Sequence, residues 1–280
     1  MQVHIFQTGS VCVSPYLPFG GNCNILQAMG LTTPHSQWLW LPVFCYLIET
    51  PRGRVLVDTG WSRTMSPNGV LDRQAQIRSL GNYLLYRTNQ GVVPNGQTAC
   101  EHLAAMGLSV QDIDYILLTH LDCDHANGLM DFGQPKHVLC SEEELQFAQR
   151  KSLINSIRYQ KQWWQNAGLQ TFRWNGTEGP FKHSFDLFGD GSVVAIHLPG
   201  HADGQCAVRV QNTAGDFVLL TADAGYACRS WKDIVPSGIA ANRKQQMQSL
   251  LWLHEQSLLP NCRAMLASHD TEIKEGTIVI

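Results

Sequence analysis

Short apolar runs alternate with longer amphipathic segments along this chain of 280 residues. The apolar runs are rich in β-branched and aromatic residues and are bounded by turn residues, a pattern that predicts strands. Four of these runs lie in the first half of the chain: Val43–Thr50, Arg54–Val57, Tyr115–Thr119 and His137–Cys140. Four more lie in the second half: Val193–Leu198, Ala207–Val210, Phe217–Thr221 and Arg263–Ala267. The turn residues 51–53 join the first two runs and predict a hairpin.

Helical spacing of apolar residues marks two other segments. Val70–Arg87 and Lys244–Gln256 both carry apolar residues three and four positions apart, which predicts helices. Gly81 weakens the first of these predictions, because glycine is unfavourable inside a helix. Gln146–Ala167 is polar and helical in composition. The chain therefore mixes helices and strands, with too many strands for a helical bundle.

Capping boxes predict the starts of two further helices. Thr98 is followed three residues later by Glu101, and Gly107 fits the end of that helix. Ser141 and Glu144 have the same spacing, and a run of three glutamates follows Ser141. Acidic residues are favourable in the first turn of a helix.

Composition and charge exclude several classes of protein. Hydrophobic residues make up 44% and charged residues 15%, so we expect an ordered domain, and we assign residues 1–280 to one. The net charge of −3 argues against a general nucleic-acid binder. The longest apolar run, Trp38–Ile48, is far shorter than the ~20 residues of a membrane helix. Residues 1–10 lack the features of a signal peptide, so a cytoplasmic location is expected.

The chain contains nine cysteines, none of them spaced as C-x-x-C. An odd number without that spacing argues against a disulfide framework and against a zinc ribbon. We therefore expect most of them to be small buried apolar residues.

The segment 119–125, Thr-His-Leu-Asp-Cys-Asp-His, has the highest density of candidate metal ligands. It directly follows a predicted strand and contains His120, Asp122, Asp124 and His125. Imidazole and carboxylate groups bind Zn²⁺, Mn²⁺ or Fe²⁺. Cys123 lies between two of the aspartates, and we expect it to pack away from them.

Other polar residues also follow predicted strands, and loops at strand ends are where sites are usually built. These residues are Asp58, His201, Asp223 and His269. Each one alone is as consistent with a buried, hydrogen-bonded polar residue as with a ligand. Together they predict that several strand ends converge on one site.

The order of these motifs resembles that of the metallo-β-lactamase superfamily, and within it most closely the N-acyl homoserine lactone lactonases. The resemblance implies an α+β fold, an αββα sandwich of two mixed sheets flanked by helices. It matches the central H-x-H-x-D-H motif to residues 120–125, the bridging aspartate to Asp223 and the other two ligand histidines to His201 and His269. Asp58 matches an acidic residue that orients ligands. Tyr226 stands three residues after the bridging aspartate, as in the lactonase branch.

The resemblance also implies a cofactor of two divalent metal ions, Zn²⁺ in the first instance, with Mn²⁺ or Fe²⁺ as alternatives. The first ion is expected on His120, Asp122 and His201, and the second on Asp124, His125 and His269, with Asp223 bridging. Such a pair of ions activates water for hydrolysis. Asp124 is the candidate proton shuttle, and Tyr226 the candidate donor to the oxyanion.

Asp122 departs from the pattern, because the family's usual residue at this position is histidine. Carboxylate is also a normal zinc ligand, so Asp122 is predicted to bind the first ion. Its negative charge should make the bound water less acidic and favour harder metals. A degenerate site with a single ion stays open as an alternative.

The expected function is opening of the lactone ring of a small acyl lactone. Thioester, carboxyl-ester and phosphodiester hydrolysis are alternatives, as is a metal-binding member without hydrolytic activity. No G-x-S-x-G motif is present, which argues against a serine hydrolase. Asp-Thr-Gly occurs once, at 58–60, whereas an aspartic protease needs two such carboxylates. No nucleic-acid or membrane partner is expected, and a homodimer is left open.

Overall fold

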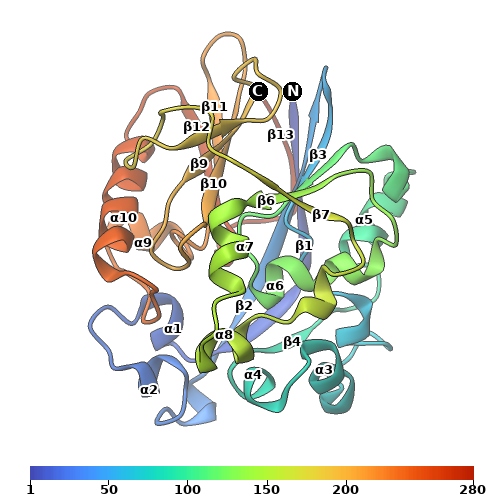
Figure 1. Cartoon of the computed structure of the whole chain (residues 1–280), viewed down its shortest axis with the longest axis vertical. Coiled ribbons are helices and arrows are strands. Elements are labelled where there is room, and N and C mark those ends of the chain that lie inside the picture. Colours follow the sequence, from blue (N-terminus) through green and yellow to red (C-terminus); the bar gives the residue numbers. More distant parts are fainter.

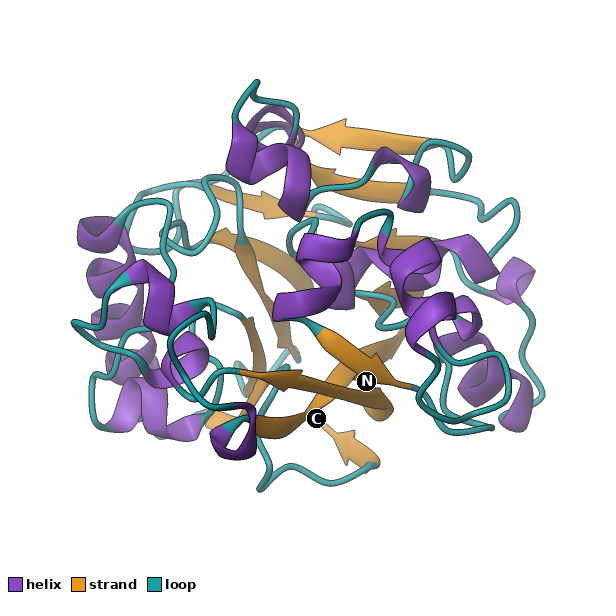
Figure 2. Ribbon diagram, turned by 90° about the horizontal axis from the view of Figure 1, so that it is seen from below, coloured by secondary structure: helices purple, strands orange, loops and turns teal.

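The computed structural model describes all 280 residues. Its strands form two sheets that lie in the middle of the molecule, with helices on both outer sides (Figure 1, Figure 2). The larger sheet has the order β13-β1-β2-β3-β5-β6-β7, with β4 also paired to β1. Its strands are β1 (Gln2–Val13), β2 (Leu39–Thr50), β3 (Gly53–Val57), β4 (Gln90–Val92), β5 (Tyr115–Leu117), β6 (Val138–Ser141), β7 (Leu169–Phe172) and β13 (Gly276–Val279).

The smaller sheet has the order β12-β11-β10-β9-β8. Its strands are β8 (Ser184–Asp186), β9 (Val193–His197), β10 (Cys206–Gln211), β11 (Phe217–Ala222) and β12 (Cys262–Ala267). Both sheets contain parallel and antiparallel strand pairs. In the larger sheet β2–β3 is antiparallel and β3–β5 is parallel. In the smaller sheet β10–β11 is antiparallel and β11–β12 is parallel. The predicted sandwich of two mixed sheets is therefore confirmed.

The helices are mostly short. They are α1 (Tyr16–Phe19), α2 (Ile25–Ala28), α3 (Arg73–Leu80), α4 (Tyr83–Thr88), α5 (Ala99–Ala105), α6 (Cys123–Ala126), α7 (Glu142–Ala148), α8 (Leu153–Arg158), α9 (Cys228–Lys232) and α10 (Arg243–Ser257). Five 3₁₀ turns are η1 (His35–Gln37), η2 (Arg63–Met65), η3 (Val110–Asp112), η4 (Asn127–Asp131) and η5 (Lys161–Trp163). No helix combines the length and the apolar character that a bilayer crossing requires.

Alternation along the strands divides the apolar residues among three clusters. In β2, Phe44 and Tyr46 face the cluster between the two sheets, whereas Cys45 and Leu47 face the helices outside. The strands of the smaller sheet alternate in the same way, and their outer residues pack against α9 and α10. Successive side chains of a strand point to opposite faces, so each sheet is apolar on both sides. This pattern produces the four layers.

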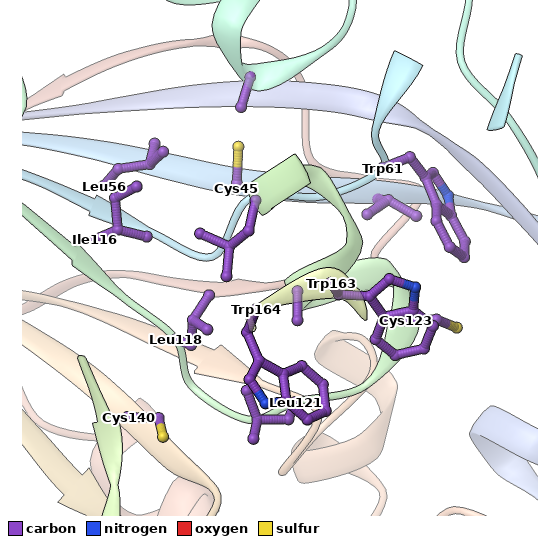
Figure 3. Close-up of a cluster of buried hydrophobic side chains, with 14 of the residues drawn as sticks. Cys45, Leu56, Trp61, Ile116, Leu118, Leu121, Cys123, Cys140, Trp163 and Trp164 are labelled. Carbon is purple, nitrogen blue, oxygen red and sulfur yellow. The ribbon is translucent and has the colours of Figure 1, made fainter. Parts of the chain in front are cut away.

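The largest cluster fills the space between the larger sheet and its helices, and it reaches the ligand segment. Leu121 and Cys123 lie in it with Trp163 and Trp164 (Figure 3). Cys123 packs into this cluster as expected, but it is not fully apart from the candidate ligands, because its Sγ lies 3.9 Å from Asp124 Oδ1. All nine cysteines are free.

The structure corrects two helix predictions. The segment 70–87 forms two helices, because Gly81 adopts the left-handed conformation that ends α3 and Asn82 caps α4. The segment 146–167 is likewise divided into the end of α7, α8 and η5. The edge strand β13 and its neighbour β1 were not predicted from the sequence.

The two sheets are hydrogen-bonded to each other where the site lies. The Cys206 amide of β10 donates to the Thr119 carbonyl, which follows β5, at 3.1 Å. The Phe44 amide of β2 donates to the Ser268 carbonyl, which follows β12, at 3.0 Å. These bonds fix the strand ends of one sheet relative to those of the other.

The ligand segment should depend on its apolar anchor. Leu121 is completely buried between His120 and Asp122, so Leu121→Ala should lower the free energy of unfolding by about 2–5 kcal/mol. Leu251→Ala, at a residue of α10 that is 48% exposed, should change it by less than about 0.5 kcal/mol. Denaturant titrations of both variants and wild type make the comparison. Equal effects at the two positions would contradict the anchoring role.

Candidate metal centre

The ligand segment turns sharply after β5 into the short helix α6. Asp122 is the N-cap residue of α6, and its carboxylate makes no capping bond, which leaves it free for other partners. His120 and His125 are fully buried, and their ring centroids lie 4.0 Å apart. Asp124 is also buried. The turn therefore brings all four predicted ligands of this segment to the same place.

The other predicted ligands come from the smaller sheet. His201 lies beyond the end of β9, Asp223 directly after β11, and His269 two residues after β12. All three are buried. Ala222, just before Asp223, has a positive φ of 48°, a strained backbone that ends the strand and redirects the chain. The sequence-based expectation that these strand ends converge agrees with this geometry.

Ligand atoms of four residues come close together here, and we call Asp124, His125, Asp223 and His269 the second half-site. Asp223 Oδ1 lies 3.3 Å from Nε2 of His125 and 3.3 Å from Nε2 of His269. His269 Nε2 lies 3.4 Å from Asp124 Oδ2. A tetrahedral ion with bonds of about 2.1 Å separates its ligands by about 3.4 Å. The spacing therefore fits one zinc-sized ion.

Unpaired buried atoms support the same interpretation. His120 Nε2, His125 Nε2 and Asp223 Oδ1 are buried without any hydrogen-bond partner, and the three residues form one compact group of potential ligands. Buried polar atoms without partners are costly and rare in folded proteins. A divalent cation among them would remove this cost. His125 and Asp223 belong to the second half-site, so that half-site fits a metal ion, and His120 lies beside it.

The remaining three ligands, His120, Asp122 and His201, form what we call the first half-site. Here the carboxylate already has a cationic partner, because Arg158 Nε lies 2.5 Å from Asp122 Oδ1 and Arg158 Nη2 lies 2.7 Å from Oδ2. Burial acts to raise the pKa of Asp122, but Arg158 and the two histidines hold it well below its usual value. The first half-site therefore does not fit an ion while Arg158 lies in it.

Asp58 orients the second half-site without being part of it. Its Oδ2 lies 2.8 Å from His125 Nδ1, and its Oδ1 accepts a hydrogen bond from the Thr119 amide at 2.8 Å. With Nδ1 engaged, His125 presents Nε2 to the other ligands. His269 is oriented in the same way, with Nδ1 2.8 Å from the Pro42 carbonyl. Partners of this kind hold a ligand ring in position and set its tautomer.

Tyr226 lies against both half-sites. Its hydroxyl is 3.4 Å from His201 Nδ1, and its ring stacks on His269 with centroids 5.3 Å apart. Burial, together with the carboxylates of Asp223 and Asp122, raises the pKa of Tyr226 well above its usual value. The hydroxyl is therefore protonated at neutral pH and can donate a hydrogen bond.

Two residues of the site had not been identified from the sequence as functional: Arg158 and Glu144. Arg158 belongs to no motif, and the only sign of it was the extra negative charge of Asp122, which needs a cation. Glu144 was predicted as a capping residue. Ser141 does cap α7, but the Glu144 carboxylate turns inward and accepts from the amides of Leu121 and Gly204 at 3.0 and 3.2 Å. It thereby links the loops that carry Asp122 and His201.

An apolar pocket opens onto the metal centre. It encloses about 980 Å³ of space, part of it open to solvent. Its floor holds Asp122, Asp124, Arg158 and Tyr226. Most of the other lining residues are aliphatic and come from β1, α1, α2, β2, α4, α8 and the segment after α9: Val11, Val13, Leu17, Ile25, Met29, Leu41, Leu85, Ile154, Ile157 and Ile239. The pocket therefore suits a molecule with an apolar tail and a polar group that reaches the centre.

Comparison with known proteins agrees with this geometry. Residues 38–253 match the profile of the metallo-beta-lactamase superfamily. The chain belongs to this superfamily. The matched region includes every predicted ligand except His269.

Individual relatives within the superfamily are distant. The chain is 26% identical to an N-acyl homoserine lactonase of Rhizobium radiobacter over 238 residues, which is 84% of this chain and 81% of the relative. It is also 26% identical to an N-acyl homoserine lactonase of Bacillus cereus over 222 residues, 79% of each chain.

Solved structures share the fold. An N-acyl homoserine lactone hydrolase with N-hexanoyl-L-homoserine bound at its metal centre superposes with a TM-score of 0.73 at 21% identity, covering 97% of this chain and 94% of that one. A dizinc quorum-quenching lactonase superposes with a TM-score of 0.62 at 15% identity, covering 96% of this chain and 87% of the other.

Glu144 should make stability depend on pH. Burial raises its pKa from 4.5 to about 7, although the two amides favour the carboxylate. The folded state therefore holds this proton more tightly than the unfolded chain does. The resulting stabilisation, on the order of 3 kcal/mol, is complete below about pH 4.5 and is lost as the pH rises through about 7.

Glu144→Gln cannot titrate, so its free energy of unfolding should fall less than that of wild type between about pH 5 and about pH 8. Denaturant titrations of chelator-treated protein at the two pH values measure the difference. Glu255→Gln, at an exposed residue of α10, is the control and should behave as wild type. If the free energy of unfolding depended on pH in the same way in Glu144→Gln and wild type, the pKa of the Glu144 carboxyl would not be raised by folding.

Proposed function

We propose that this chain is a metal-dependent hydrolase that opens the ring of N-acyl homoserine lactones, a quorum-quenching lactonase, with residues 1–280 acting as one catalytic domain. The observation that carries the proposal is the aliphatic pocket whose floor is the carboxylate and imidazole cluster. An N-acyl homoserine lactone has the matching form, an apolar chain joined to a compact polar ring. The names of the relatives favour the same substrate class.

Asp124, His125, Asp223 and His269 would hold the catalytic ion. Their mixture of imidazole and carboxylate suits Zn²⁺, with Mn²⁺ and Fe²⁺ as alternatives. A divalent ion at such a site lowers the pKa of water and polarises a carbonyl group. Asp58 and the Pro42 carbonyl keep His125 and His269 in the ligand orientation throughout the reaction.

The side chains around the ion then divide the remaining tasks. Tyr226 donates its hydroxyl hydrogen to the carbonyl oxygen as negative charge develops there. Asp124 carries the proton from the attacking water to the ring oxygen that leaves, so that the ester bond is exchanged for a carboxylic acid and an alcohol. Arg158 adds fixed positive charge on the same floor of the pocket.

A substrate panel tests the proposed reaction. Zn²⁺-loaded protein should hydrolyse short- and long-chain N-acyl homoserine lactones with higher kcat/KM than acyl thioesters, simple carboxyl esters or phosphodiesters. Protein treated with a chelator should lose the activity and regain it with Zn²⁺. A higher kcat/KM for a thioester or a phosphodiester would show that this compound class, and not the lactones, is the substrate. Absence of turnover with every substrate class would indicate a metal-binding protein without hydrolytic activity.

Two neighbouring residues of α8 test the role of the pocket. Ile154 lines the pocket and is 68% exposed, whereas Leu153 is 78% exposed and does not line it. Ile154→Asp places a charge beside the acyl chain and should raise KM for a long-chain lactone by up to about tenfold, equivalent to about 1.4 kcal/mol, with little effect on a short-chain lactone. Leu153→Asp should leave both KM values near wild type. Equal changes in KM for the two variants would show that the acyl chain does not bind in this pocket.

A further inference from the structure

Arg158 lies where the first metal ion of a two-ion centre would bind. Its Nη2 is 2.7 Å from Asp122 Oδ2 and 2.7 Å from His201 Nε2. These are two of the three ligand atoms of the first half-site. One guanidinium nitrogen thus contacts both atoms that an ion would have to bind.

The distances between ligand atoms also favour an ion in the second half-site rather than in the first. In the first half-site Asp122 Oδ2 lies 3.5 Å from His120 Nε2 but only 2.8 Å from His201 Nε2. In the second half-site His269 Nε2 lies 3.3–3.4 Å from Asp223 and Asp124, and His125 Nε2 lies 3.3 Å from Asp223. A tetrahedral ion needs about 3.4 Å between its ligands. Of the three unpaired buried atoms of the centre, Nε2 of His125 and Oδ1 of Asp223 belong to the second half-site, and Nε2 of His120 belongs to the first, while Asp122 and His201 both have Arg158 as a partner. The first half-site is therefore closed around a guanidinium, and the second is spaced for an ion.

Several contacts hold Arg158 in this place. Its Nε lies 2.5 Å from Asp122 Oδ1, which completes a two-pronged pair with the carboxylate. Its Nη1 donates to the His201 carbonyl at 3.3 Å, and the guanidinium lies 5.0 Å from the ring centroid of Tyr159. The side chain is only 16% exposed. A two-pronged arginine–carboxylate pair is among the strong hydrogen-bonded pairs, so an ion would have to displace a well-anchored group.

Charge repulsion leads to the same conclusion. The guanidinium already neutralises the Asp122 carboxylate, and a second divalent ion would add two positive charges next to it. Histidine at position 122 would leave Arg158 without its carboxylate, so Asp122 and Arg158 are complementary.

We infer that this centre binds a single divalent ion, in the second half-site, and that the guanidinium of Arg158 permanently replaces the ion of the first half-site. The expectation of two ions from the sequence is revised accordingly. Asp122 and His201 then serve to hold Arg158 rather than a metal. This inference concerns the number of ions and does not depend on which substrate the enzyme hydrolyses.

Metal content tests the inference directly. Protein loaded with excess Zn²⁺ and desalted should contain about one ion per chain by elemental analysis, and Arg158→Ala should contain about two, because Asp122 and His201 become free to bind. Arg150→Ala removes a surface arginine that pairs with Asp203, and this control should stay at about one. With Mn²⁺, electron paramagnetic resonance should show an isolated ion in wild type and an exchange-coupled pair in Arg158→Ala.

Two further variants keep the test decisive if Arg158→Ala fails to fold. His269→Ala should lose the ion, whereas His201→Ala should retain it with Kd changed less than about threefold. Two ions in wild type, one ion in folded Arg158→Ala, no ion in wild type, or loss of the ion in His201→Ala would each overturn the inference. Two ions in wild type would leave the outcome of the substrate panel unaffected, so the two failures can be distinguished.

Discussion

The carboxylate of Asp58 is the contact on which the arrangement of the centre depends. It follows β3, accepts hydrogen bonds from the amide and hydroxyl of Thr119 after β5, and lies 2.8 Å from His125 Nδ1 in α6. Asp58 reaches these partners from a left-handed backbone with φ of 60°, which costs conformational energy. That cost is offset because one buried carboxylate fixes two parallel strand ends and a ligand ring together. Thr119 in turn connects to β10, and the second sheet is thereby aligned with the first.

The centre concentrates buried negative charge, and each carboxylate is stabilised in a different way. Asp58 has a histidine and hydroxyl or amide donors, whereas Asp122 has a guanidinium. Asp223 has an oxygen without any donor. Unpaired buried charge is costly, so the positions without partners indicate where a cation belongs. Glu144 differs from the aspartates because burial raises its pKa to about 7, so that near neutral pH part of the population carries the uncharged carboxyl group.

The convergence of the candidate ligands could be predicted from the sequence because each one lies at or just beyond the end of an apolar run, and strand ends converge at a sheet edge. The strands β5, β9, β11 and β12 were recognisable for the same reason. Arg158 could not be predicted, since its role depends on where α8 packs, and nothing local to residues 153–158 indicates that. Gly81 shows a related limit: periodicity continued across it, and only its left-handed backbone divides the helix. The direction of the Glu144 side chain was also set by distant amides rather than by the capping motif.

The helix α8 has only six residues, and it contributes to the pocket at both of its ends. Ile154 near its start lines the part of the pocket open to solvent, and Arg158 at its end lies on the floor beside Asp122. A short helix moves as a rigid unit, so a shift that widens the pocket at one end also tilts the guanidinium at the other. A substitution that repositions this helix to reshape the pocket would therefore alter the electrostatics of the centre as well. The shape of the pocket and the charge beside Asp122 depend on the same six residues, so divergence of one is expected to constrain the other.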